Sequence, residues 1–152
     1  MEQAVRQVTE SLHDSFGNSI PEWYAGYVKA MGDRSFDEVL QFHARTMPEI
    51  IAGLSPTTLG FAYAEGKWTV AEVLLHLIDC ERIFVYRALR IARGDKTPLP
   101  GFDENLYVPN SGASARSAES LVEEYHAVRQ STLTFFRNLD AAALQRIGTA
   151  NG

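Results

Sequence analysis

The chain has 152 residues, 45% of them hydrophobic and 22% charged, and this composition predicts one globular domain with a single core. A net charge of −5 argues against binding to nucleic acid or to an anionic membrane, because both need a concentrated positive surface. The N-terminal residues lack a continuous apolar stretch, and no run of apolar residues is long enough to span a bilayer. The single cysteine, Cys80, excludes an intrachain disulfide. Together these features predict a cytoplasmic protein.

The N-terminal part carries only a weak helical pattern. Apolar side chains recur at helical spacing over residues 2–16, and we therefore treat residues 1–19 as an extension with a weak helix. A turn around Pro21 leads into an aromatic-rich segment that ends near Met31. The main domain is expected to span residues 20–152.

The first core helix is predicted to begin at a capping box. Ser35 can cap a free backbone amide, and Glu38 can reach back to the amide of Ser35. Pro48 lies inside this helix and is expected to kink or locally break it, because proline cannot donate to the carbonyl one turn earlier. The apolar stripe that follows the cap is Phe36, Leu40, His43, Met47, Ile50, Ile51 and Leu54.

The second core helix is predicted to begin at another capping box, formed by Thr69 and Glu72, and to stop at Gly94. Its first half, from Val70 to Ile78, is apolar on nearly every side and is expected to be deeply buried. The predicted inner face of this helix is Val73, Leu74, Leu77, Cys80, Phe84, Ala88 and Ile91.

The third core helix is predicted from about Ser117 to Leu139. The connection before it, residues 93–116, contains three prolines and three glycines. A loop of this length inside a small domain is more often functional than filler. No β-strand pattern survives, so the predicted fold class is all-α. The stripe of the third helix is Leu121, Tyr125, Val128, Thr132, Phe135, Phe136 and Leu139.

One stretch resembles a known family. Residues 67–82 read KWTVAEVLLHLIDCER and contain a W-x-x-x-E-x-x-x-H pattern made by Trp68, Glu72 and His76. With the G-T-A-N-G ending at residues 148–152, this pattern is similar to the DinB/YfiT-like superfamily, and the resemblance extends from about residue 20 to the end.

The resemblance implies an up-down four-helix bundle that holds a divalent metal such as zinc, nickel or manganese with three histidines. One histidine corresponds to His76 on the second helix, and the other two form an H-x-x-x-H pair on a fourth helix that follows the G-T-A-N-G turn. This chain ends on that turn, at Gly152. We therefore expect the fourth core helix to be missing, a long loop between the second and third core helices, and an incomplete metal site with His76 as its one remaining ligand.

The resemblance also implies a function. Members resemble thiol-dependent S-transferases and metal-dependent hydrolases that act on small molecules, and the implied partners are a small-molecule substrate and a low-molecular-weight thiol. A metal bound by three imidazoles can lower the pKa of a water or thiol. The alternative function is a non-catalytic helical module that self-associates, as a homodimer, through an open core groove.

Each residue near His76 also has an ordinary interpretation. A single histidine on an apolar helix face is usually a hydrogen-bonded structural residue. Asp79 and Glu81 could orient His76 by hydrogen bonding, although an ion-paired surface role is favoured for Glu81. Cys80 lies one turn after His76, so the two could bind a metal together, but a small buried apolar role for the thiol is favoured.

His43 offers a second hypothesis. It falls in the stripe of the first helix, and in an antiparallel helix pair its depth would match that of His76 to within a few ångströms. A two-histidine metal site is therefore possible on geometry, while a core histidine bonded to a neighbour is favoured. His126 and His13 are predicted to be surface residues.

Overall fold

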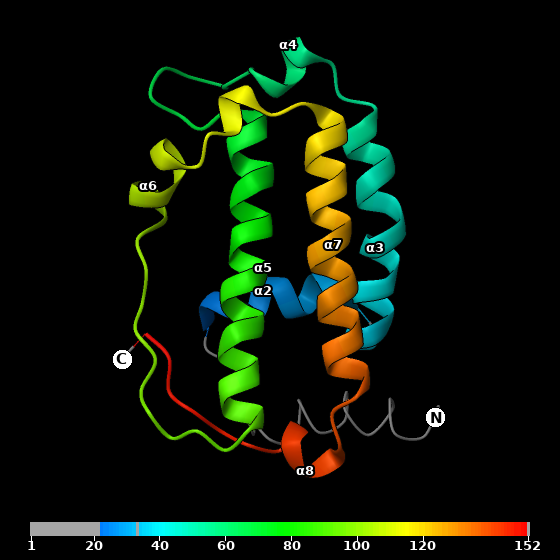
Figure 1. Ribbon diagram of the computed structural model, residues 1–152, viewed down its shortest axis with the longest axis vertical. Coiled ribbons are helices and arrows are strands. Elements are labelled where there is room, and N and C mark those ends of the chain that lie inside the picture. Colours follow the sequence, from blue (N-terminus) through cyan, green and yellow to red (C-terminus); the bar gives the residue numbers. More distant parts are fainter. Residues whose placement is uncertain (1–21, 33, 152) are drawn as a thin grey trace.

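The computed structural model describes residues 22–32 and 34–151, and within them the regular structure is helical (Figure 1). Three long helices dominate: α3 (Phe36–Ala52), α5 (Val70–Ala92) and α7 (Ala118–Arg137). The all-α prediction is confirmed, and the predicted helix at residues 2–16, with His13, lies outside the described residues. The shorter helices are α2 (Glu22–Met31), α4 (Pro56–Leu59), α6 (Glu104–Tyr107), η1 (Val108–Asn110), η2 (Ala113–Ala115) and α8 (Ala141–Leu144).

Both predicted capping boxes are present. The Ser35 hydroxyl accepts a hydrogen bond from the Glu38 amide at 3.2 Å, and the Glu38 carboxylate accepts one from the Ser35 amide at 2.7 Å. Thr69 and Glu72 make the same pair of bonds at the start of α5, at 3.2 and 2.6 Å. Each cap satisfies backbone amides that have no partner inside the helix, which stabilises a helix by ~1 kcal/mol.

The ends and interior of the helices also follow local chemistry. Gly94 adopts φ +80°, and the amide of Asp95 donates to the carbonyl of Arg90 at 3.0 Å, so a left-handed glycine terminates α5 as predicted. The Arg90 guanidinium bonds the Asp95 carboxylate and lowers its pKa to about 2. Pro48 lies within α3, which continues as one helix through it.

The long helices do not follow the simple up-down order that we predicted. Arg129 pairs with Glu81, 48 residues earlier, and η2 at the start of α7 packs beside the first turns of α5. Hence α5 and α7 run parallel, whereas α3 runs antiparallel to both (Figure 1). The physical reason is the connection over residues 93–117, which returns along the whole length of α5 before α7 begins. The predicted long loop is thus confirmed, and it contains α6, η1 and η2.

A polar network joins the three long helices. Arg129 on α7 donates two hydrogen bonds of 2.8 Å to the carboxylate of Glu81 on α5, and a third of 3.2 Å to the carbonyl of Leu40 on α3. The Tyr125 hydroxyl donates to the carbonyl of His43 at 3.1 Å. Burial of the Tyr125 ring raises its pKa. Because these groups are largely shielded from water, they set the depth at which the helices align.

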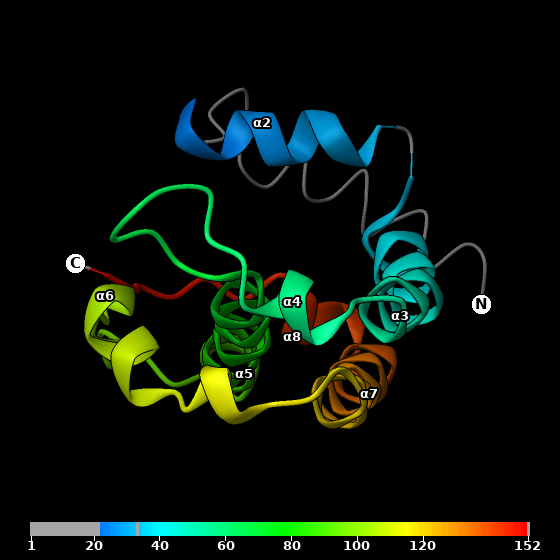
Figure 2. The same cartoon turned by 90° about the horizontal axis from the view of Figure 1, so that it is seen from above.

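The core lies where α7 packs against α3 and α5 (Figure 2). On α5 the packed face matches only in part the one that we predicted from spacing: Leu74 is in the core as predicted, but three other members of that face are exposed. Val73, Leu77 and Phe84 are 42%, 49% and 53% exposed, and the buried side chains lie on the opposite side of the helix. The fully buried core cluster is Ile51, Leu59, Ala71, Leu74, Leu75, Ile78, Ala113, Ala118, Leu121 and Tyr125.

The error has a simple cause. Because α5 is apolar around most of its circumference, helical periodicity alone cannot tell which of two apolar faces meets α7. We call the exposed side, formed by Val73, His76, Leu77, Cys80 and Phe84, the outer face of α5. The stripe of α7 is partly or fully buried throughout, as predicted.

On α3, Ile50 is 56% exposed and is also wrong as an inner residue. Its neighbour Ile51, which belongs to the same predicted stripe, is fully buried as predicted. No described helix is both long and apolar enough to cross a membrane.

Candidate functional site

His76 lies on the outer face of α5 and is half-buried. Its ring contacts the ring of Trp68, with centroids 5.0 Å apart and planes inclined by 56°. Trp68 is held in place because the next residue, Thr69, is the N-cap of α5. The local capping chemistry therefore positions the indole against the imidazole two turns into the helix.

Cys80 lies one helical turn after His76. Its sulfur is 3.4 Å from Nε2 and 3.7 Å from Nδ1 of the imidazole, so the predicted proximity of the two side chains is confirmed. Cys80 is half-buried rather than fully enclosed. Burial is the largest cause that raises the pKa of the thiol, and the carboxylates of Asp79 and Glu104 act in the same direction. The thiol is therefore the dominant form at neutral pH.

The two carboxylates near His76 have other partners. Asp79 forms an ion pair of 3.3 Å with Arg82, on the solvent side of α5. Glu81 is ion-paired, as favoured, but its partner is Arg129 and not the adjacent Arg82, and the pair is shielded from solvent where we expected a surface role. Neither carboxylate has a described hydrogen bond to His76.

His43 has separate surroundings on α3. Its ring contacts Phe42 with centroids 5.3 Å apart, and its carbonyl accepts the Tyr125 hydroxyl. Burial lowers the pKa of its imidazole, and the positive charges of Arg129 and Arg34 lower it further. His43 and His76 lie on helices that both pack on α7, and no described hydrogen bond or ring contact joins the two histidines. Our favoured prediction, a core histidine bonded to a neighbour, is met in part: the ring is partly buried and contacts Phe42, but no described hydrogen bond is made by its nitrogens.

Few potential metal-binding side chains lie close together in the described residues. Within residues 22–32 and 34–151 no three histidine, cysteine, aspartate or glutamate side chains are grouped closely enough to hold a metal ion. His76 and Cys80 together provide two neighbouring donors, which is fewer than a protein metal site normally uses. His126 is exposed on α7, as predicted.

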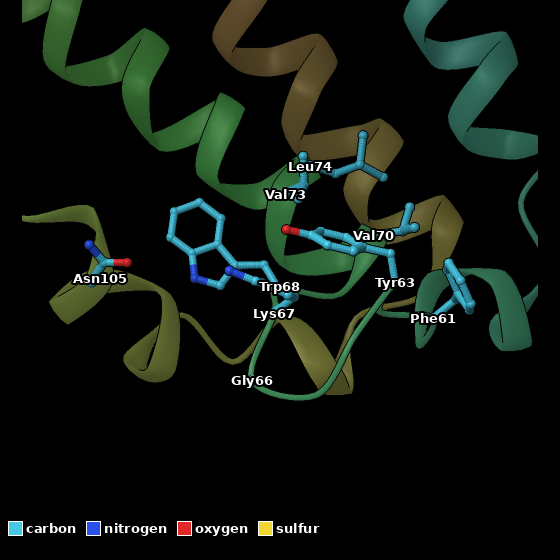
Figure 3. Close-up of a pocket in the computed structure, with 9 residues that line it drawn as sticks. All are labelled: Phe61, Tyr63, Gly66, Lys67, Trp68, Val70, Val73, Leu74 and Asn105. Carbon is cyan, nitrogen blue, oxygen red and sulfur yellow. The ribbon is translucent and has the colours of Figure 1, made fainter.

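A cleft of about 480 Å³ is lined in part by Trp68, the residue whose ring contacts His76 (Figure 3). It lies between the loop of residues 60–69, the first turns of α5, and α6. Sequence reasoning missed this cleft, and the available signal was three aromatic residues within eight positions. The lining residues are Phe61, Tyr63, Gly66, Lys67, Trp68, Val70, Val73, Leu74 and Asn105.

Sequence reasoning also missed Arg87, which is only 8% exposed. Its guanidinium donates to the carbonyl of Pro100 at 2.9 Å and to the side-chain oxygen of Asn151 at 2.8 Å. An isolated backbone bridge between Leu99 and Ala150 lies beside it. Arg87 thereby fastens the G-T-A-N segment to the long connection. The sequence feature that could have indicated this role is an arginine at helical spacing from the apolar residues of the outer face.

The close packing at Gly148 and the backbone conformation of Asn151 account for the glycine and the asparagine at these two positions. A Cβ atom at Gly148 would lie 2.5 Å from a side-chain carbon of Ile91, so only glycine allows this approach. Asn151 adopts φ +67°, a left-handed conformation that asparagine tolerates better than most residues. Its amide donates to the carbonyl of Leu99 at 3.1 Å.

Comparison with known proteins gives one result that covers most of the chain. The family model described as the DinB superfamily matches residues 39–152. No curated protein and no solved structure shows a significant match. The matched range contains α5, with His76 and its neighbours, and the segment fastened by Arg87.

Proposed function

Because the chain belongs to the DinB superfamily, we propose that it is a metal-dependent enzyme domain that acts on a small molecule, either as a thiol-dependent S-transferase or as a hydrolase. In this proposal His76 is a metal ligand and a low-molecular-weight thiol is the co-substrate of the transferase. The observation that carries the proposal is the placement of His76. It lies half-buried on the outer face of α5, with no hydrogen-bonded carboxylate among the described residues, and its ring contacts Trp68, which lines the cleft.

The residues described do not fit a resident metal by themselves. His76 would supply one of three imidazoles, and the part of the chain seen in the structure contains no grouped set of three donors. A fourth core helix with two further histidines would complete the site. The outer face of α5 is a suitable surface for such a helix, since Val73, Leu77 and Phe84 project apolar side chains there.

Metal analysis tests this proposal. The purified chain is dialysed against zinc, nickel or manganese, and bound metal is measured beside the His76→Ala variant. The matched control is His126→Ala, since His126 is an exposed histidine on a different helix. We expect weak binding by the two neighbouring donors His76 and Cys80, lost in His76→Ala and retained in His126→Ala. Absence of bound metal, or equal binding by both variants, would overturn the role of His76.

A second candidate function is self-association of a non-catalytic module, favoured by the same exposed apolar face. If two copies of α5 met antiparallel about a twofold axis between Ile78 and Asp79, Val73 would lie opposite Phe84, and Leu77 opposite Cys80. Each line of contact then pairs a smaller side chain with a larger one. This complementarity supports a second copy of the chain as the occupant.

The mass of the particle in solution tests the second candidate. We expect a dimer that Phe84→Glu converts to a monomer, because the new charge would be buried at the interface. Leu106→Glu is the matched control, since Leu106 is 67% exposed on α6 and lies outside the outer face. A wild-type chain that is monomeric at high micromolar concentration would argue against this candidate.

A further inference from the structure

The cleft beside Trp68 has a chemical character that differs from the rest of the surface. Two of its aromatic side chains project into solvent, with Phe61 60% and Tyr63 75% exposed. Exposed aromatic surface is unfavourable in water by roughly 25 cal/mol per Å², so a cluster of it usually marks a binding site. With Trp68, these rings make three walls of one cleft (Figure 3).

The loop that carries these rings is closed on itself. The amide of Val70 donates to the carbonyl of Phe61 at 3.0 Å, which ties the two ends of the loop together. Within it, the amide of Lys67 donates to the carbonyl of Ala64 at 3.2 Å, and Gly66 supplies the left-handed turn with φ +70°. The aromatic walls are therefore positioned before a ligand arrives, which reduces the entropic cost of binding.

The polar groups of the cleft are one cation and one amide. Lys67 and Asn105 line it, and no carboxylate is among its lining residues. Glu65 and Glu104 are chain neighbours of lining residues but do not themselves line the cleft. Among the described residues no ion pair involves Lys67, so its ammonium group is available to a ligand.

We propose that this cleft binds a small aromatic carboxylate. The ring system would lie among Phe61, Tyr63 and Trp68, and the carboxylate would pair with the ammonium group of Lys67. Stacked and edge-on aromatic contacts contribute beyond simple burial, and a carboxylate is the natural partner of an unpaired lysine. A cleft of about 480 Å³ is large enough for a one- or two-ring molecule. Ligand binding in the cleft does not require a metal at His76. The result of its test is therefore independent of the enzyme proposal.

Titration with a matched pair of probes tests the site. 2-Naphthoate is added to the metal-free chain, and binding is followed by amide chemical shifts in NMR spectra. 2-Naphthalenemethanol has the same ring system without the charge. We expect naphthoate to shift the amides of the 60–69 loop and the start of α5, and to bind several-fold more tightly than the alcohol. Raised salt concentration should weaken binding of naphthoate and leave that of the alcohol unchanged.

Variants separate the charge from the aromatic walls. Lys67→Gln should weaken naphthoate binding about fivefold, a value typical of one solvated ion pair, while Lys67→Arg should retain it. Lys96→Gln is the matched control, since Lys96 is an exposed lysine outside the cleft. Tyr63→Ala should weaken both probes, because it removes a wall and leaves the charge. All three positions are exposed, so the four variants should fold normally.

Three results would overturn the proposal. The first is no naphthoate binding at millimolar concentration. The second is equal affinity for naphthoate and the alcohol, unaffected by Lys67→Gln. The third is shifts confined to amides outside the cleft.

Discussion

The two sides of α5 have similar amino-acid compositions but different environments. The side that meets α7 carries Leu75 and Ile78, which are buried, and Glu81, which forms the shielded pair with Arg129. The outer face carries Leu77 and Phe84, which are equally apolar yet about half exposed. Hydrophobicity therefore does not determine which side of a helix is packed. On α5 the packed side is distinguished by a polar group with a specific partner on the neighbouring helix.

The largest expected effect is the loss of stability when an apolar side chain on the packed side of α5 is shortened, compared with the same change on the outer face. Ile78→Ala should lower the free energy of unfolding by about 3 kcal/mol, because it removes buried methyl groups and leaves a cavity. Leu77→Ala, on the outer face, should lower it by less than about 1 kcal/mol. Urea unfolding of both variants measures the two values. Equal losses would show that the outer face is covered in solution by another helix or a second copy.

The second effect concerns the polar pair on the packed side. Arg129→Met should cost about 2 kcal/mol, because it leaves the Glu81 carboxylate shielded from water without its partner. Combining it with Glu81→Gln should cost less than the sum of the two single changes, and the difference measures the coupling between the two side chains. Additive losses would mean that the pair does not link α5 to α7. The exposed pair of Asp79 and Arg82 is the control, with an expected coupling below about 0.5 kcal/mol.

The third effect concerns the one place where we find the outer side of α5 covered, at Arg87, which holds the segment of residues 149–151. Arg87→Met should release residues 149–151 from the long connection, at a cost of about 1 kcal/mol. The amides of Leu99 and Asn151, which bond across this junction, should then exchange with solvent about tenfold faster. Arg93→Met, at an exposed arginine beyond the end of α5, should leave both amides unchanged. Unchanged exchange in Arg87→Met would show that backbone bonds alone hold the segment.

The smallest effect is a pH dependence of stability that comes from His43 on α3, which packs on the same helix, α7, as the packed side of α5. The pKa of His43 is lowered in the folded chain, so between pH 6.5 and the lower folded pKa the unfolded state binds more protons. The free energy of unfolding should therefore fall as the pH drops below 6.5. In His43→Gln this fall should be smaller, whereas in His126→Gln it should persist. A wild-type profile that is flat between pH 7 and 5 would contradict the prediction.

Features set by neighbouring residues were predictable from the sequence. The two capping boxes, the glycine that terminates α5 and the approach of Cys80 to His76 each depend on residues within one or two turns. Residues packed from a distance were not predictable in this way. The face of α5 that is buried depends on where α7 lies, and α7 lies where it does because the 93–117 connection runs back along the bundle.

The candidate site shows the same division. His76 was found because its pattern with Trp68 and Glu72 is local, and the family match over residues 39–152 supports the assignment of the fold. The cleft requires the loop of residues 60–69 to close and α6 to approach it, and α6 comes more than thirty residues after the loop. Arg87 and Asn151 are 64 residues apart, and no spacing rule connects them.

The parallel course of α5 and α7 also affects the order in which the chain can fold. Although α3 and α5 are consecutive long helices, they make little contact, and the hydrogen bonds that join the long helices connect residues 48, 82 and 89 positions apart. Closing such long chain segments costs conformational entropy before any contact repays it, so we expect slower folding than in a bundle of successive helical hairpins. The segment held by Arg87 can dock only after the connection lies along α5. It should therefore be the last part to form during refolding and the first to detach when the protein unfolds.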